Sequence, residues 1–123
     1  MKKLCIATGV IALLVVGWRW SSATPQDLDP LKVAADTHKL LFENRFVRVL
    51  DVHIPPGKTE PWHSHGRRVA IYLTDYHSRT TEKGGQPQEN MRQSGFARWV
   101  EPTTHQVENI GKNEAHVISV ELK

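Results

Sequence analysis

The chain has 123 residues, which is enough for one domain and too few for two. Hydrophobic residues make up 39% and charged residues 24%, a globular composition that excludes a disordered tail and a membrane bundle. The formal charge of +3 comes from Lys2, Lys3 and Arg19, because the remaining residues carry 13 basic against 13 acidic side chains. No basic run longer than Arg67-Arg68 occurs beyond residue 23, so nucleic acid is excluded as a partner.

The N-terminal segment, residues 1–23, is typical of a signal peptide. Two lysines precede an apolar run over residues 4–18, and the small residues Ser21 and Ala23 fit cleavage after Ala23. This pattern predicts a periplasmic or secreted protein. The alternative is an uncleaved anchor in the inner membrane through residues 4–18, although that run is shorter than the roughly 20 residues of a typical span. The only cysteine, Cys5, lies in this segment, so the mature chain forms no disulfide.

The rest of the chain predicts β structure in short pieces. Residues 24–36 indicate a linker, within which Leu31 to Ala35 fits either one helical turn or a loose strand. Beyond it, runs of β-branched and aromatic residues predict strands at 38–42, 46–54, 68–74, 76–82, 89–93, 96–100, 106–110 and 115–122. Seven or eight short strands with frequent turns predict a sandwich or small barrel over residues 37–123.

Histidines carry the chemistry that the sequence suggests. His63 and His65 lie two residues apart, so both point to the same face of a strand, and His105 follows Pro102 in a short loop that leads into another strand. Ligands that converge from different strands can hold a metal ion. Two surface histidines on a solvated strand would produce the same local pattern, so the pair alone does not establish a metal site.

The spacing around these histidines resembles the two motifs of the cupin family. Gly57 stands six positions before His63-x-His65, as in the first motif, and Gly95 is followed by Pro102, His105 and Asn109 close to the spacing of the second. The chain resembles a small single-domain cupin over about residues 37 to 123. The amino-acid sequence around these motifs is most similar to that of a bacterial subgroup that includes proteins named for β-alanine degradation. This resemblance implies an all-β, cupin-type jelly-roll barrel and a homodimer.

The resemblance also implies a ligand set. Carried over position by position, the metal ligands are His63, His65 and His105, which would hold a divalent ion such as Fe, Zn, Mn or Ni. The glutamate of the family motif is missing, because Val69 and Ala70 occupy its place. Three imidazoles still suffice for a metal ion, as in three-histidine zinc sites.

Acidic and basic residues near the motif provide further candidates. Glu60 and Glu101 are close enough in sequence to replace the missing carboxylate, but Glu60 precedes Pro61 and has the opposite strand parity to His63, so it is not favoured. Arg67 and Arg68 could hold a carboxylate substrate, and a solvated turn is an equally good interpretation of the pair.

The other histidines and the large aromatic residues favour plainer interpretations. A surface position is expected for His38 and His77, and an exposed or packed position for His53 and His116. The aromatic side chains most simply pack the barrel: Trp62, Tyr72 and Trp99.

Three functions remain open at this point. The first is a metal-dependent enzyme on a small polar or carboxylate metabolite, for which the sequence singles out no general base. The second is a non-catalytic module that binds a metal or a small ligand. The third is a structural cupin whose histidines bind nothing, and a shared fold does not decide among the three.

Overall fold

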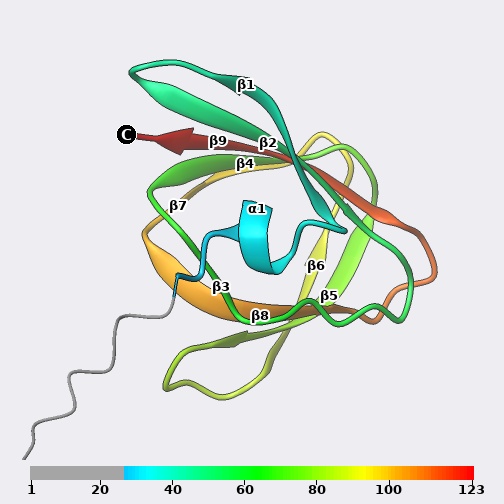
Figure 1. Cartoon of the computed structure of the whole chain (residues 1–123). Coiled ribbons are helices and arrows are strands. Elements are labelled where there is room, and N and C mark those ends of the chain that lie inside the picture. The colour runs from blue at the N-terminus through cyan, green and yellow to red at the C-terminus, as the bar shows by residue number, and fades with distance from the viewer. Residues whose placement is uncertain (1–26) are drawn as a thin grey trace, which may run out of the picture.

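The computed structural model describes residues 27–123 (Figure 1). The signal segment and the possible anchor therefore lie outside the described residues. Among residues 27–123, no helix is long and apolar enough to cross a membrane.

The segment interpreted as a linker contains one turn of helix, α1 (Pro30–Val33). The Asp29 side chain accepts a hydrogen bond from the Leu31 amide and caps this turn, and Pro30 has the fixed φ that suits a first helical position. Pro30 and Ala34 are buried, so α1 packs against the strands that follow it. Of the two alternatives for Leu31 to Ala35, one helical turn or a loose strand, the structure shows the helical turn.

In the described part of the chain, nine strands form two antiparallel sheets that enclose a barrel (Figure 1). The five-stranded sheet has the order β1-β2-β9-β4-β7 and the four-stranded sheet the order β3-β8-β5-β6. In chain order the strands are β1 (His38–Glu43), β2 (Val47–Ile54), β3 (His63–His65), β4 (Arg68–Tyr72), β5 (Tyr76–Glu82), β6 (Gln88–Arg92), β7 (Ala97–Val100), β8 (Thr103–Asn109) and β9 (Ala115–Leu122). The predicted all-β jelly-roll barrel is confirmed.

Alternation along the strands separates the barrel interior from the surface. A small apolar core fills one part of the interior, made of Leu50, Val52, Ile54, Val107 and Ala115. In β9, His116 and the apolar Ile118, Val120 and Leu122 lie on the outer face of the sheet. The inner face instead carries the buried Ser119 and Glu121. The barrel interior is therefore apolar in one part and polar in another.

Three residues of the two motifs shape the loops. Gly57 and Gly95 have φ values of +77° and +85°, a left-handed conformation that favours glycine. Asn109 is fully buried, and its Nδ2 donates to the Ile54 and Asn113 carbonyl oxygens at 2.7 and 2.8 Å. Asn109 thus ties the end of β8 to two other segments, which is a structural role.

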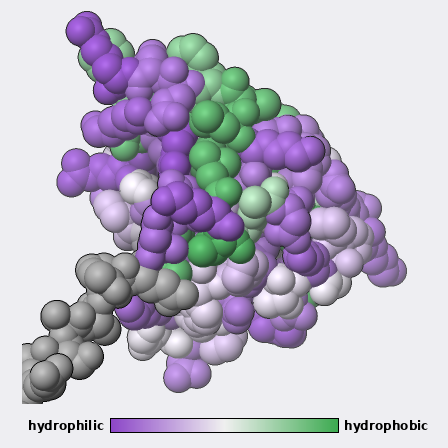
Figure 2. All heavy atoms as spheres, in the orientation of Figure 1, coloured by the Kyte–Doolittle hydropathy of each residue, from purple (hydrophilic) through white to green (hydrophobic). Residues whose placement is uncertain are grey.

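Several large apolar side chains lie on the surface. Trp99 is 48% exposed and Trp62 is also exposed, so the prediction that these two tryptophans pack the barrel is wrong, whereas Tyr72 is buried as expected. β7 is an edge strand, and the Trp99 side chain stands on the outside of the barrel with Nε1 donating to Glu101 Oε1. Figure 2 shows hydrophobic side chains gathered over β1, where Leu40, Leu41 and Phe42 are exposed.

Candidate metal centre

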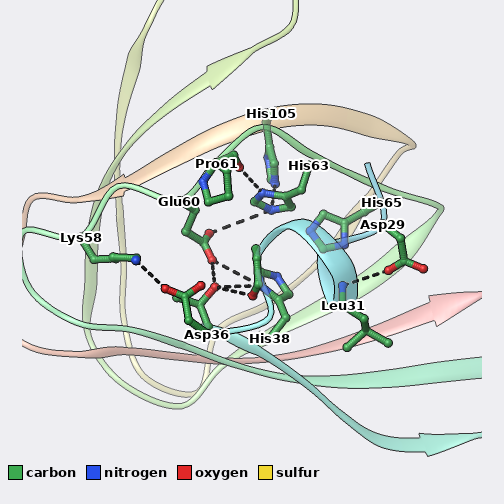
Figure 3. Close-up of polar contacts among 12 residues, drawn as sticks. Asp29, Leu31, Asp36, His38, Lys58, Glu60, Pro61, His63, His65 and His105 are labelled. Carbon is green, nitrogen blue, oxygen red and sulfur yellow. Dashed lines mark hydrogen bonds and ion pairs between the residues drawn. The ribbon is translucent and has the colours of Figure 1, made fainter. Parts of the chain in front are cut away.

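The histidines of the two motifs meet inside the barrel (Figure 3). His63 on β3 lies directly opposite His105 on β8, with 3.1 Å between their Nε2 atoms. The ring centroid of His65 is 4.9 Å from that of His63 and 5.4 Å from that of His105. His105 belongs to strand β8 rather than to the loop that the sequence suggested. The structure therefore brings all three predicted ligands together, and all three are buried.

A fourth histidine joins them, because the surface position predicted for His38 is wrong. His38 is 3% exposed, and its ring centroid lies 5.0 Å from that of His63 and 5.5 Å from that of His65. His38, His63 and His65 are positioned to hold a metal ion, since each offers a ligand atom within 4.8 Å of those of the other two. Sequence pattern alone could not reveal this position, because β1 is an edge strand whose remaining residues are all exposed.

The unfavoured Glu60 also faces the cluster. Its side chain is 1% exposed, its Oε2 lies 4.0 Å from His63 Nε2, and its Oε1 lies 3.3 Å from His38 Nδ1. The Thr37 hydroxyl donates to the same Oε1. The parity argument failed because Glu60 precedes β3, so the alternation of that strand does not extend to it.

Hydrogen bonds to the Nδ1 atoms set the proton positions on two rings. His63 Nδ1 lies 2.8 Å from the Pro61 carbonyl oxygen, which only accepts, so His63 carries its proton on Nδ1. His65 Nδ1 lies 2.5 Å from Glu121 Oε1, which favours the same tautomer. Both rings therefore have an Nε2 lone pair free to bind a cation, as histidine ligands with an outer carboxylate or carbonyl partner do.

The carboxylate behind His65 is itself held in place. Arg48 donates from Nε to Glu121 Oε2 and from Nη1 to Asp29 Oδ2, both at 2.8 Å, and its Nη2 forms an ion pair with Glu121 Oε2 at 2.7 Å. The interactions form a chain from the cap of α1 through Arg48 and Glu121 to the His65 ring. This chain fixes the orientation of a ligand ring, which increases metal affinity.

Burial keeps the histidines neutral. Desolvation is the main cause that lowers the pKa of His63 and holds the pKa of His65 well below its usual value. The same cause lowers the pKa of His105 to about 2. Metal ligation requires the neutral ring, so these histidines are ready to bind without losing a proton.

The donor set fits a divalent cation. Two Nε2 atoms at 3.1 Å would repel through their lone pairs unless a proton or a cation lies between them. With metal–nitrogen bonds of about 2.1 Å, that separation corresponds to a nitrogen–metal–nitrogen angle of about 95°, which suits an octahedral ion better than a tetrahedral one. The buried Glu60 carboxylate contacts the Thr37 hydroxyl and the imidazoles of His38 and His63, so a cation would also offset the cost of its burial.

The histidines line a small inner chamber that joins a larger outer one. The inner chamber has a volume of about 80 Å³ and contains all four histidines and Glu60 on its walls. The outer chamber, of about 290 Å³, is lined mostly by polar side chains of β5, β6, β7 and β8. Both chambers share the side chains of Arg68, Tyr72, Tyr76 and His105. A small molecule in the outer chamber can therefore reach the histidine cluster.

The two candidate arginines lie in different places. Arg68 is 6% exposed and faces both chambers, and burial lowers the pKa of its guanidinium to about 10. Arg67 is exposed and pairs with Glu101 at 3.5 Å, outside the barrel. Glu101 is exposed too and does not replace the missing carboxylate. Only Arg68 of the pair belongs to the site.

A second histidine cluster stands on the outer face of β2 and β9. His53 and His116 lie opposite each other with ring centroids 4.0 Å apart, and both contact Asp51, at 3.2 and 2.7 Å. His53 Nδ1 also lies 2.7 Å from Glu114 Oε1, and this hydrogen bond raises the pKa of His53. We call Asp51, His53, Glu114 and His116 the outer cluster.

Comparisons with known proteins identify the fold. No family model matches the chain, and no curated protein matches its sequence. Among solved structures, a cupin domain protein from Bordetella pertussis is 23% identical with a TM-score of 0.64, over 70% of this chain and 91% of that one. An RmlC-like cupin family protein from Methanocaldococcus jannaschii is 16% identical with a TM-score of 0.57, over 69% and 77%. The chain therefore has the cupin fold, a double-stranded β-helix.

Proposed function

We propose that the protein is a metal-dependent cupin that acts on a small polar or carboxylate-bearing metabolite. One observation carries this proposal: four buried histidines, three of them kept neutral by burial, converge in a chamber that opens into a polar cavity. A purely structural cluster would need a proton between the Nε2 atoms of His63 and His105 and would still leave the buried Glu60 carboxylate without a cation. An apolar filling would be the more stable way to pack a barrel.

The ligands proposed are His63, His65 and His105, as the cupin motifs imply, with His38 and Glu60 completing the set. A divalent ion held there would supply Lewis-acid chemistry to a substrate oxygen. The residues of the chain provide the rest: Glu121 and the Pro61 carbonyl oxygen orient two rings, and the buried chamber excludes bulk water. The ion is Fe, Zn, Mn or Ni in this proposal.

Elemental analysis of the purified protein tests the proposal. We expect about one divalent ion per chain in the wild type and none in the variant His63→Ala. The matched control is His116→Ala, which removes a histidine of the outer cluster and should retain the ion. A metal-free wild type that also fails to bind added Zn²⁺, Fe²⁺, Mn²⁺ or Ni²⁺ would show that the cluster is structural.

Location, partner and subgroup are further parts of the proposal. The lysine pair and the apolar run over residues 4–18 support export to the periplasm, or anchoring in the inner membrane if the segment is kept. The exposed apolar side chains of β1 and the outer sheet face, among them Phe42 and Trp99, support a homodimer. The similarity of the amino-acid sequence around the motifs supports placement in the bacterial subgroup that includes proteins named for β-alanine degradation. N-terminal sequencing of the cellular protein tests the first point, because an intact Met1 in the cytosolic fraction would contradict export.

A further inference from the structure

Arginines dominate the charge of the outer chamber. Among residues 27–123, Arg68, Arg92 and Arg98 line it, whereas the only acidic side chain on its walls is Glu82. The wall formed by β4 and β7 places two of them close together, because Arg68 pairs with Val100 and Arg98 pairs with the neighbouring Ala70 on the same inner face. The chamber therefore carries an excess of positive charge next to the histidine cluster.

These guanidinium groups have few partners of their own. Among residues 27–123, neither Arg68 nor Arg98 takes part in an ion pair, whereas Arg48, Arg67 and Arg79 all do. Arg68 is more than nine-tenths buried, and its Nη1 has no hydrogen-bond partner. Burying a cationic donor without a partner costs several kcal/mol of folding free energy. An unpartnered guanidinium that faces a cavity therefore indicates that a ligand binds there.

Arg92 has a similar arrangement. Its Nη1 donates to the Met91 carbonyl oxygen at 2.8 Å and its Nη2 to Asn90 Oδ1 at 3.3 Å, while its buried Nε remains without a partner. The two hydrogen bonds hold the guanidinium against β6, on the opposite sheet from Arg68 and Arg98. The chamber thus offers guanidinium donors from both sheets.

We propose that the outer chamber is a carboxylate-binding subsite in which Arg68 and Arg98 bind a small organic anion, with Arg92 opposite them. This inference rests on the proposed function, since it concerns the substrate of the same site. Arginine binds carboxylates through paired N–H donors, and a dicarboxylate would balance the excess of two positive charges left by three arginines and Glu82.

The position of Arg68 sets the orientation of the bound anion. Because Arg68 and His105 belong to the wall that the two chambers share, a carboxylate on Arg68 leaves the remaining atoms of the molecule next to the histidine cluster. The outer chamber has a volume of about 290 Å³, which suits a short-chain acid.

Succinate is a suitable probe, and its diamide succinamide is the neutral control of the same length. We expect calorimetry on the metal-loaded wild type at low salt to show that succinate binds at least tenfold more tightly than succinamide. Arg98→Met and Arg68→Met should each weaken succinate binding at least tenfold while the bound metal is retained. The matched control is Arg67→Met, which removes the same charge from the adjacent surface position and should change the affinity less than twofold.

Each outcome of this experiment decides a point. Equal binding of succinate and succinamide, equal weakening by Arg67→Met, or tighter binding of inorganic phosphate than of succinate would overturn the carboxylate subsite. If Arg68→Met does not fold, the exposed Arg98 still provides the test. A wild type that binds no metal but binds succinate through Arg98 would contradict the proposed function and support the subsite.

Discussion

The protein has two histidine clusters, and their surroundings give the same side chain opposite properties. In the inner chamber, burial lowers the pKa values of His63, His65 and His105 and keeps their rings neutral. In the outer cluster, the hydrogen bond to Glu114 raises the pKa of His53, which is 39% exposed in its side chain. The inner rings thus keep lone pairs free for a metal ion, whereas the ring of His53 binds a proton more readily than a free histidine does.

The largest expected effect separates the two clusters by metal affinity. His63→Ala or His105→Ala should reduce the affinity for Zn²⁺ by more than 100-fold, because each removes an imidazole from the buried set. His116→Ala should leave the tight site unchanged within about twofold. Competition with a metal indicator dye measures both. Loss of the tight site in the His116 variant, with the His63 variant unaffected, would reverse the assignment of the two clusters.

Removal of the metal ion tests whether the inner cluster serves metal binding alone or also holds the fold together. The apolar core around Leu50 and Val52 does not involve the ion, so the metal-free protein and the variant His105→Ala should both stay folded. Their thermal midpoints should be lower than that of the metal-loaded wild type only by the amount that the bound ion contributes. Circular dichroism at 25 °C before and after chelation measures this. An unfolded chelated protein would show that the metal is structural.

The chain behind His65 predicts a smaller effect. Glu121→Gln keeps the shape of the side chain but removes the charge between His65 and Arg48, and the affinity for Zn²⁺ should fall by about 10–100-fold. The control is Glu114→Gln, which makes the equivalent change beside His53 in the outer cluster. An unchanged affinity in Glu121→Gln would mean that packing alone orients the His65 ring.

Acid should destabilise the metal-free protein through the inner cluster. The unfolded chain takes up protons on its histidines below about pH 6.5, whereas the folded chain resists because its pKa values are lowered. The free energy of unfolding should therefore fall as the pH drops from 7 to 5.5, by up to about 1.4 kcal/mol per pH unit for each such histidine. Urea denaturation after chelation measures it, and a flat profile would contradict the account.

The outer cluster should act weakly and with the opposite sign. The raised pKa of His53 stabilises the fold below about pH 6.5, and this contribution is lost as the pH rises through the folded value. The groups are exposed enough that solvent screens them, so His53→Ala should change the free energy of unfolding by less than about 1 kcal/mol at pH 6. A loss of unfolding free energy well above 1 kcal/mol would show that burial is not the deciding difference between the two clusters.

The sequence predicted the fold and the core of the site because both depend on spacing. The spacing of Gly57, His63, His65 and His105 reflects local turns and strand alternation, and such features can be recognised in the amino-acid sequence. The sequence could not predict His38, since its burial depends on how the edge strand β1 closes over the chamber. Glu60 was missed because the parity of β3 was extended past the end of that strand.

The electrostatic differences were also beyond the sequence. Arg67 and Arg68 are adjacent and chemically identical, yet only the fold shows that one pairs with Glu101 on the surface and the other faces the chambers. His53 and His116 meet only because β2 and β9 pair in the observed register. Such long-range pairings set burial and therefore pKa values.

Anomalous diffraction from crystals of the protein loaded with one equivalent of Zn²⁺ tests the central claim most directly. We predict one strong peak inside the barrel, at about 2.1 Å from the Nε2 atoms of His63, His65 and His105, with weak or no density between His53 and His116. A peak at the outer cluster with none in the inner chamber would contradict the account.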